Sequence, residues 1–354
     1  VLLNVFAITA LLVIGPALGI SDLESIGRLL SWAIMASGIA QLLLVFFACR
    51  AHGMRIRFVV PRWTKRLRRL FILMGPGVLA AGIQQINIFV GTMIASNQEG
   101  ANSWLYFADR IYQLPLGMIG IALGVVLLPD ITRRLRSGDA EGANHSLNRG
   151  MEIALLITLP AAMAMLVIPG PIISTLFERG EYTAEDTKQA AYALAAFALG
   201  LPGYVLIRVL QPGYFAREDT VRPMKMGAVT VTVNTGLSLA LFPLIGHIGI
   251  AIATTVAAWA NVAMLLFGLR KEFTTDASVR SRVPRMLVAS IAMGGIVYGL
   301  SLLLTPWFTG NFFVKVLALS ILVAVGMAAY GGLCLVTRAA SLRELKAGFS
   351  RSKA

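Results

Sequence analysis

Long apolar stretches, separated by short polar turns, make up most of the chain. Ten of them have the length of about 20 predominantly apolar residues that an α-helix needs to cross a bilayer. They cover approximately residues 1–20, 26–49, 71–95, 104–129, 151–177, 190–211, 224–245, 247–269, 284–305 and 312–337. None alternates with the period of two that is typical of a β-barrel strand. The pattern predicts an all-α, polytopic membrane bundle with about ten transmembrane helices in this chain.

The composition supports a membrane protein. Hydrophobic residues make up 57% of the chain and charged residues 14%, whereas soluble domains have about 45–50% apolar and about 25% charged residues. Cys49 and Cys334 form no CxxC pair, and the three histidines lie far apart. The sequence therefore predicts no disulfide framework and no metal site.

The 31 basic residues are distributed unevenly between the predicted loops. A net charge of +14 would suggest nucleic-acid binding in a soluble protein. However, 25 of the basic residues fall in alternate loops or in the C-terminal tail, on one side of the membrane, and four on the other. The positive-inside rule places the basic side, with the C-terminus, in the cytoplasm. The charge thus predicts orientation and contact with membrane lipids, and no nucleic-acid partner.

The most basic loop runs from Arg50 to Leu70 and mixes seven further arginines and lysines with apolar residues such as Trp63 and Leu67. It has two interpretations. It is either a basic linker that obeys the topology or an interfacial amphipathic helix that joins two halves of a transporter.

Asp109 and Arg110 are charged residues inside the predicted span 104–129. Arg110 and Gln113 share one helical face with Gly117, Gly120 and Gly124. One interpretation is an Asp–Arg pair that anchors the helix at the headgroup level. The other is a cation that faces a cavity and binds an anionic substrate, because the planar guanidinium can bond two phosphate oxygens at once.

Other spans also contain polar residues. Gln84 and Asn87 share a face of the span 71–95, which suits either interhelical hydrogen bonds or substrate contact. Arg208 near the end of the span 190–211 either extends to the cytoplasmic interface or contributes to the same site.

A cation site is a further hypothesis. Asn234 and Ser238 lie one turn apart and could bind a cation together with Thr254 or Thr255. No Walker A or GxSxG motif occurs, so we expect a transporter without catalytic residues or cofactor rather than an enzyme. Its driving force would be the membrane potential, a monovalent cation or a substrate gradient.

Four motifs occur in order along the chain. They are Gly75-Pro76-Gly77 through Gln85-Ile86-Asn87, SWLYFADRIYQLPLG at 103–117, LFERGEYTAED at 176–186, and VLQPGYFAREDT at 209–220 with Arg222-Pro223. In order and spacing they resemble the MurJ/MviN family of lipid II flippases, over nearly the whole chain. This family belongs to the MOP exporter superfamily, in which two six-helix lobes rock around a central cavity, and its members have fourteen spans.

The resemblance implies a domain organisation. Residues 1–49 would be the last two helices of the N-terminal lobe, and 50–70 the cytoplasmic inter-lobe linker. Residues 71–275 would form the six-helix C-terminal lobe, 276–337 an extra helix pair with a groove for the lipid tail, and 338–354 a basic cytoplasmic tail. The family's first four helices would have no counterpart in this chain.

The resemblance also implies a function. The substrate would be the undecaprenyl-diphosphate-linked disaccharide-pentapeptide, carried by alternating access from the inner to the outer leaflet of the bacterial cytoplasmic (inner) membrane, in contact with the cell-wall synthesis machinery. Arg110 and Asp109 match a cavity cluster of the family, with Asp109 pairing Arg110 in the empty state. Gln113 stands where some members have Glu, and Arg208 where relatives have a basic residue. Alternatives are a flippase for another polyprenyl-linked oligosaccharide, a non-transporting membrane scaffold and a membrane-embedded enzyme.

Overall fold

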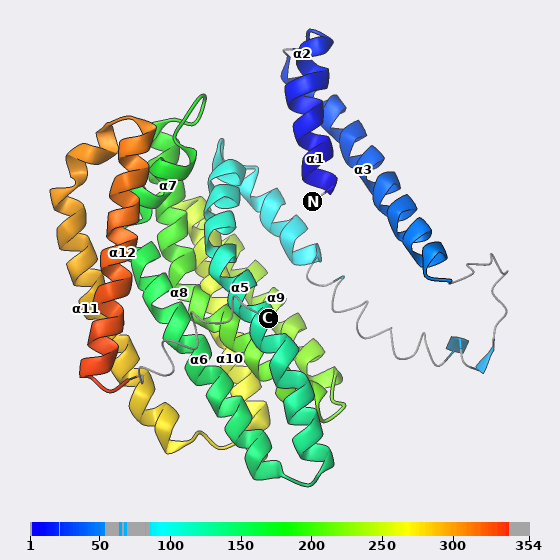
Figure 1. The fold of residues 1–354 in the computed structure, drawn as a ribbon, viewed down its shortest axis with the longest axis vertical. Helices are drawn as coiled ribbons and strands as arrows, with labels where there is room; N and C mark the ends of the chain where they lie inside the picture. The colour runs from blue at the N-terminus through cyan, green and yellow to red at the C-terminus, as the bar shows by residue number, and fades with distance from the viewer. Residues whose placement is uncertain are drawn as a thin grey trace. The chain divides into compact units, whose positions relative to one another are not determined.

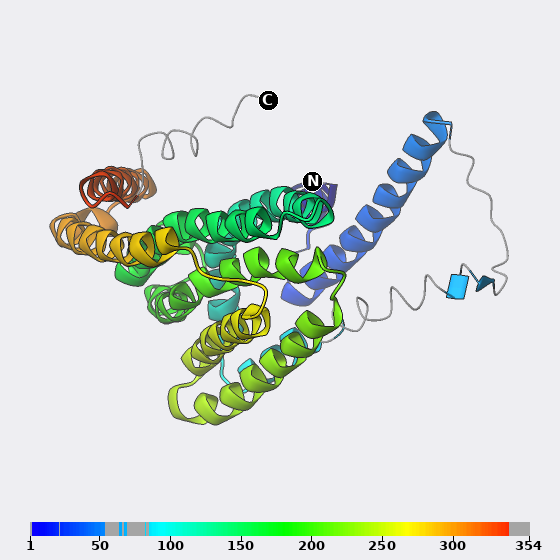
Figure 2. The same cartoon turned by 90° about the horizontal axis from the view of Figure 1, so that it is seen from below.

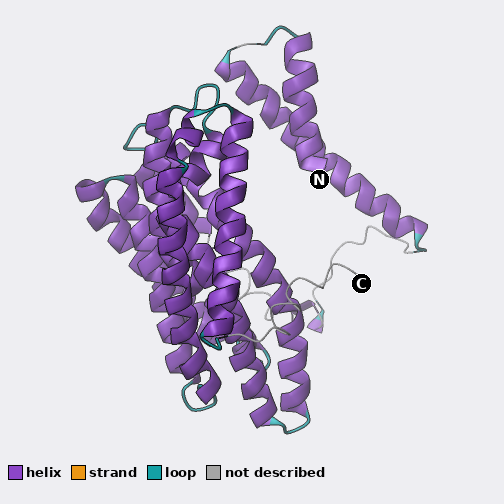
Figure 3. Cartoon of the chain, turned by 60° about the vertical axis from the view of Figure 1, so that its left-hand side comes forward, coloured by secondary structure: helices purple, strands orange, loops and turns teal. Residues whose placement is uncertain are grey.

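The computed structural model describes residues 2–20, 22–53, 64–65, 67–68, 82 and 85–339, without the side chains of residues 23 and 118–125. All regular elements in these ranges are helices, and no strand occurs in them (Figures 1 and 3). This confirms the all-α class. The chain divides into two compact units, residues 1–68 and residues 69–354, which are described separately.

The first unit is a helical hairpin. Its elements are α1 (Leu2–Thr9), a π-helical turn (Ala10–Ile14), α2 (Gly15–Ala17) and α3 (Leu23–Ala51). Asp22 caps α3 by accepting a hydrogen bond from the Ser25 N–H at 2.8 Å, and this bond holds the pKa of the Asp22 carboxyl below its usual value. The two helical stretches coincide with the predicted spans 1–20 and 26–49.

The second unit is a helical bundle. Its helices are α5 (Ala101–Arg136), α6 (Ala140–Val167), α7 (Pro169–Phe177), α8 (Ala184–Phe215), α9 (Val221–Ile245), α10 (His247–Leu269), α11 (Ala277–Leu303) and α12 (Phe312–Val336), with a 3₁₀ turn at Thr305–Thr309. An apolar helical segment, Gln85–Ala95, precedes them. Figure 2 shows α11 beside α12 at one edge and α9 beside α10 at another.

Seven helices in the described ranges are long and apolar enough to cross a membrane: Glu24–Ala51 within α3, and α6, α8, α9, α10, α11 and α12. The predicted span 104–129 lies within α5, which has 36 residues. The predicted span 71–95 is described at residue 82 and from residue 85 onward, where Gln85–Ala95 is helical. The architecture is that of a polytopic helical membrane protein.

Two details differ from the expected boundaries. The span predicted at 151–177 is divided at Ile168 into α6 and α7, because Pro169 and Pro171 have no N–H to donate to the preceding turn. In addition, most of the polar stretch 131–150 is helical. Here α5 continues to Arg136 and α6 begins after the cap Asp139, whose carboxylate accepts from the Gly142 N–H at 2.8 Å.

Helix α8 forms the centre of the bundle and packs against α5, α6, α7 and α10. Leu194, Leu201, Val205 and Leu210 on this helix are completely buried. Helix α5 packs on α8, and α9 packs on α10, which itself packs on α8. Helix α8 therefore determines how the candidate site residues on these helices are placed relative to one another.

Hydrogen bonds cross the contact between α8 and α10, which we call the α8–α10 seam. Two side chains of α10 donate to backbone carbonyls of α8: Thr255 Oγ1 to Ala196 (2.8 Å) and Trp259 Nε1 to Leu199 (2.9 Å). Two side chains of α8 donate to backbone carbonyls of α10: Tyr204 OH to Thr254 (2.9 Å) and Tyr214 OH to Leu265 (2.6 Å). Each of these bonds joins a side chain to the backbone of the other helix. The seam therefore limits sliding of α10 along α8.

Gly200 allows this close approach, and we expect Gly200→Ala to destabilise the protein. A Cβ atom at Gly200 would lie 2.8 Å from Thr255 Oγ1 and 3.2 Å from Thr255 Cα. Overpacking of this kind costs about 1–3 kcal/mol, so the melting temperature of the purified full-length protein should fall. Gly236→Ala in α9 is the matched control, because nothing lies within 4 Å of its Cβ position. Equal melting temperatures for the two variants would contradict the close approach.

The pair α11–α12 is attached to the rest of the bundle at three levels. Near one end, Glu152 Oε2 of α6 lies 3.5 Å from Arg282 Nη1 of α11. In the middle, Tyr330 OH of α12 donates to the Leu156 carbonyl of α6 at 2.9 Å. At the other end, Lys315 Nζ of α12 lies 3.0 Å from Glu178 Oε1. These bonds hold the helix pair against α6 and α7.

Candidate functional site

Asp109 and Arg110 are adjacent on α5, and each also contacts a different side chain. Adjacent helical residues point about 100° apart, given 3.6 residues per turn. The Asp109 carboxylate accepts a hydrogen bond from Gln113 Nε2 one turn later. The Arg110 guanidinium lies over the Tyr106 ring, 4.6 Å from its centroid. Asp109 and Arg110 also interact electrostatically with each other. Their pairing in the empty state stays a prediction.

Arg110 is exposed on the surface of this bundle. Besides its electrostatic interaction with the adjacent Asp109, it contacts the Tyr106 ring. This ring contact uses the face of the guanidinium and leaves its five N–H donors in the plane of the group. The guanidinium is therefore available to an anion. The same is not true of Asp109, which is half-buried and bonded to Gln113.

Tyr112 connects this region to Arg208 on α8. It is 7% exposed, and its ring packs on Phe197 and on Tyr204, with centroid distances of 5.4 Å in both cases. Tyr112 interacts electrostatically with both Asp109 and Arg208. The structure thus brings the predicted residues Asp109 and Arg208 to a common neighbour. Arg208 itself is exposed.

Polar residues around Asn234 of α9 form a second group, which we call the Asn234 cluster: Asn87, Asn234, Ser238 and Thr254. Asn234 Nδ2 donates to Asn87 Oδ1 at 2.9 Å. Asn234 Oδ1 accepts from Thr254 Oγ1 at 3.3 Å and from Ser238 Oγ at 3.5 Å. The consecutive helices α9 and α10 and the distant segment Gln85–Ala95 therefore meet through one amide side chain.

Two predicted residues are not part of this cluster. Thr255 faces α8 and donates to the Ala196 carbonyl, so it is Thr254 that lies next to Asn234. Gln84 lies outside the described residues. Tyr112 and Tyr204 were not among the predicted site residues. The signal that could have found them is a hydroxyl-bearing ring in an apolar span, which normally has a polar partner when buried.

The Asn234 cluster has oxygen atoms but no carboxylate. Amide and hydroxyl oxygens suit hard cations, and the cation site stays a prediction. Over residues 85–339 and the shorter described ranges, no group of three or more His, Cys, Asp and Glu residues could hold a metal ion.

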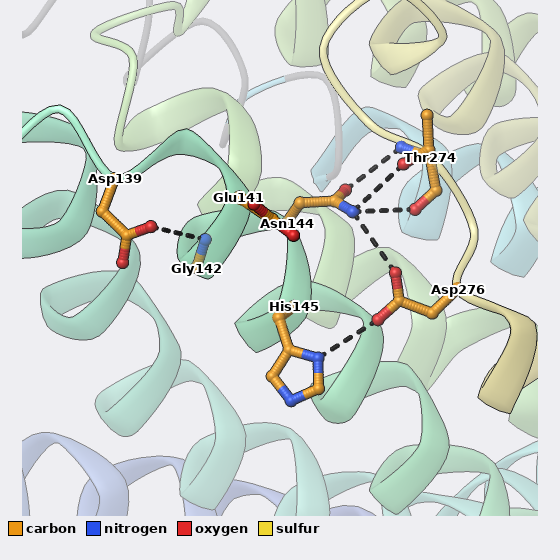
Figure 4. Close-up of a pocket in the computed structure, with 7 residues that line it drawn as sticks. All are labelled: Asp139, Glu141, Gly142, Asn144, His145, Thr274 and Asp276. Atoms are coloured by element: carbon orange, nitrogen blue, oxygen red, sulfur yellow. Dashed lines mark hydrogen bonds and ion pairs between the residues drawn. The ribbon is translucent and has the colours of Figure 1, made fainter.

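An open pocket of about 580 Å³ lies elsewhere, at the end of the bundle that carries the α5–α6 turn (Figure 4). Asn144 Nδ2 donates to the Thr274 carbonyl at 3.0 Å, and the Thr274 N–H donates back to Asn144 Oδ1 at 3.1 Å. His145 Nδ1 lies 3.2 Å from Asp276 Oδ2. These bonds attach α6 to the α10–α11 connection, which is a structural role.

The charges of the nearby α5–α6 turn are also paired with one another. Asp130 accepts from Ser146 Oγ at 2.6 Å and lies 3.0 Å from Arg134 Nε and 2.7 Å from Arg133 Nη2. The Ser146 hydrogen bond, followed by the two arginines, holds the pKa of Asp130 below its usual value.

An all-helical bundle with several helices long and apolar enough to cross a membrane defines a polytopic membrane protein. It carries an arginine and paired amides in apolar helical segments. The family profile described as "Lipid II flippase MurJ" matches residues 1–318. The chain belongs to this family.

Individual proteins are similar to the chain over most of its length. The "Probable lipid II flippase MurJ" of Rhizobium meliloti (strain 1021) is 42% identical over 340 residues, which are 94% of this chain and 63% of that protein. The protein of the same name from Vibrio cholerae serotype O1 is 31% identical, over 90% of this chain and 61% of its own length. The chain thus spans less than two thirds of these relatives.

A solved structure shares the fold. "Lipid II flippase MurJ, inward closed conformation" superposes with a TM-score of 0.74 at 24% sequence identity, covering 95% of this chain and 66% of that one. This similarity supports the helical architecture described above.

Proposed function

We propose that the full-length protein that contains this chain is a lipid II flippase. It would carry the undecaprenyl-diphosphate-linked disaccharide-pentapeptide from the inner to the outer leaflet of the bacterial cytoplasmic membrane, as a transporter without covalent chemistry. The names of the family and of the relatives support this substrate. The structural observation that carries the proposal is Arg110, an arginine within the predicted span 104–129. Its guanidinium contacts the Tyr106 ring through its face, which leaves the N–H donors directed away from the ring.

Arg110 suits the diphosphate part of the substrate. A guanidinium donates two parallel hydrogen bonds to phosphate oxygens, and such charge-assisted bonds are about twice as strong as neutral ones. Gln113 adds a side-chain amide one turn away, although it donates to Asp109 in this structure. Arg208 adds a second positive charge near Tyr112. We therefore assign Arg110 as the main anion contact and the other residues as supporting groups.

Transport requires that the bound lipid favours one state over another. A ligand can shift a conformational equilibrium only by its differential affinity for the two states. In the proposed cycle, Arg110 binds the diphosphate when the cavity is open to the cytoplasm and loses this contact as the cavity opens outward. The driving force would be the membrane potential or a monovalent cation that binds to the Asn234 cluster.

The domain organisation and orientation belong to the same proposal. Residues 1–49 end the N-terminal lobe, 50–70 link the lobes, 71–275 form the C-terminal lobe, 276–337 are the extra pair with a lipid-tail groove, and 338–354 are a tail in the cytoplasm. The bias of basic residues to one set of loops supports this orientation. Cell-wall synthesis proteins are the partners that this location suggests.

The proposal is tested by reconstituting the full-length protein into liposomes that contain lipid II. We expect the protein to accelerate exposure of the lipid II headgroup to a membrane-impermeant enzyme, relative to protein-free liposomes. Unchanged exposure would overturn the flippase function and favour a scaffold. Faster movement of another polyprenyl-linked oligosaccharide, but not of lipid II, would assign a different substrate. A chemically changed lipid would indicate an enzyme.

A further inference from the structure

A continuous series of contacts joins the Arg110 region to the Asn234 cluster through Tyr204. We propose that Tyr204 is a positioning residue that transmits changes in the Asn234 cluster to the residues beside Arg110, and so couples the two sites. This inference rests on the proposed function, because it assigns a role within lipid translocation. Neither the charge pattern nor the motifs of the sequence identify Tyr204.

The first half of the series runs from α5 to α8. Asp109 and Arg208 both interact electrostatically with Tyr112. The rings of Tyr112 and Tyr204 pack on each other, with their centroids 5.4 Å apart and an interplanar angle of 50°. A displacement of Tyr204 therefore moves the neighbour that Asp109 and Arg208 share.

The second half runs from α8 to α9 through α10. Tyr204 OH donates to the Thr254 carbonyl at 2.9 Å. The side chain of the same residue, Thr254 Oγ1, donates to Asn234 Oδ1 at 3.3 Å. Asn234 in turn bonds Asn87 at 2.9 Å. A rearrangement around Asn234 thus reaches Tyr204 through a single residue.

Helix α8 can respond locally at this point. Pro202 lies two residues before Tyr204 and has no N–H, so the carbonyl one turn earlier, at Ala198, lacks its usual helical donor. Interruptions of the hydrogen-bond ladder by proline are a common cause of helix bending. The part of α8 that carries Tyr204 and Arg208 is therefore able to move relative to the part that Thr255 binds at Ala196.

The structure provides a matched control for Tyr204. Tyr214 also lies on α8 and also donates its hydroxyl to an α10 carbonyl, that of Leu265, at 2.6 Å. Leu265 has no place in the Asn234 cluster. Replacing either tyrosine by phenylalanine removes one hydrogen bond between α8 and α10. Only Tyr204→Phe interrupts the series of contacts between the two sites.

The test measures the affinity of the purified full-length protein for lipid II in a mutant cycle. Coupling between two sites typically changes affinity by about 5- to 150-fold. We expect Asn234→Ala to weaken lipid II binding at least about 5-fold when Tyr204 is present, and less than about 2-fold in the Tyr204→Phe background. In the Tyr214→Phe background the full effect of Asn234→Ala should remain. Melting temperatures confirm that each variant is folded.

The outcomes separate the coupling from the proposed function. An equal effect of Asn234→Ala with and without the Tyr204 hydroxyl overturns the coupling, and so does the absence of any effect in the parent protein. If instead the parent protein does not bind lipid II, the proposed function fails. Should Tyr204→Phe not fold, Tyr112→Leu removes the ring that packs on Tyr204, and we expect the same loss of coupling.

Discussion

Arg110→Ala in the full-length protein is expected to slow lipid II translocation by about 10- to 150-fold. A hydrogen bond to a charged group contributes about 1.5–3 kcal/mol, and each 1.4 kcal/mol is about a tenfold change. The loss is large because no other described arginine on α5 lies between the ends of the predicted span 104–129. The rate of headgroup exposure in proteoliposomes is the measurement.

Arg136→Ala is the control for this change. Arg136 lies in the last turn of the same helix, outside the predicted span, so its removal changes the net charge equally but leaves the proposed anion contact in place. Its rate should equal that of the parent protein. Arg110→Lys keeps the charge but not the planar fork, and we expect a rate between those of the parent and the alanine variant. Parent-like rates for Arg110→Ala would remove Arg110 from the mechanism.

Much of the fold could be predicted from the sequence because lipid imposes a simple rule on it. Backbone polar groups cannot stay unpaired in the bilayer core, so a long apolar stretch must be helical. This reasoning located the helices but not all of their ends. The break at Ile168 depends on Pro169 and Pro171. The stretch 131–136 is helical although it contains three arginines, so its composition does not extend the apolar run of the span.

The candidate site was predictable only in part, for a related reason. Asp109, Arg110 and Asn234 stand out because they are polar residues in apolar surroundings. The choice between Thr254 and Thr255 could not be made, since adjacent residues point in directions about 100° apart and only the packing of α10 on α8 selects one. Tyr204 acquires its role from contacts between helices, which no local pattern encodes.

Glu152→Ala is expected to cause a large loss of stability. Glu152 on α6 is almost completely buried, with a side chain that is 5% exposed, and its Oε2 lies 2.9 Å from Arg149 Nη1 and 3.5 Å from Arg282 Nη1. Removing one partner of a buried ion pair typically costs about 3–5 kcal/mol, because the remaining charge is left uncompensated. We expect a smaller loss of about 1.5–3 kcal/mol, typical of hydrogen bonds to a charged group, because Arg149 and Arg282 are partly exposed and keep other interactions.

Thermal unfolding of the purified full-length protein measures this effect, with Glu141→Ala as the control. Glu141 is an exposed acid in the first turn of the same helix, so its removal should change the melting temperature little. Glu152→Gln keeps a hydrogen-bond acceptor but not the charge, and it should fall between the two. Because Arg282 belongs to α11, Glu152→Ala should also weaken the contact between α6 and α11. Cysteine pairs placed across this contact should therefore cross-link more slowly in Glu152→Ala than in the parent. A parent-like melting temperature together with parent-like cross-linking would show that apolar packing alone holds α11 against α6.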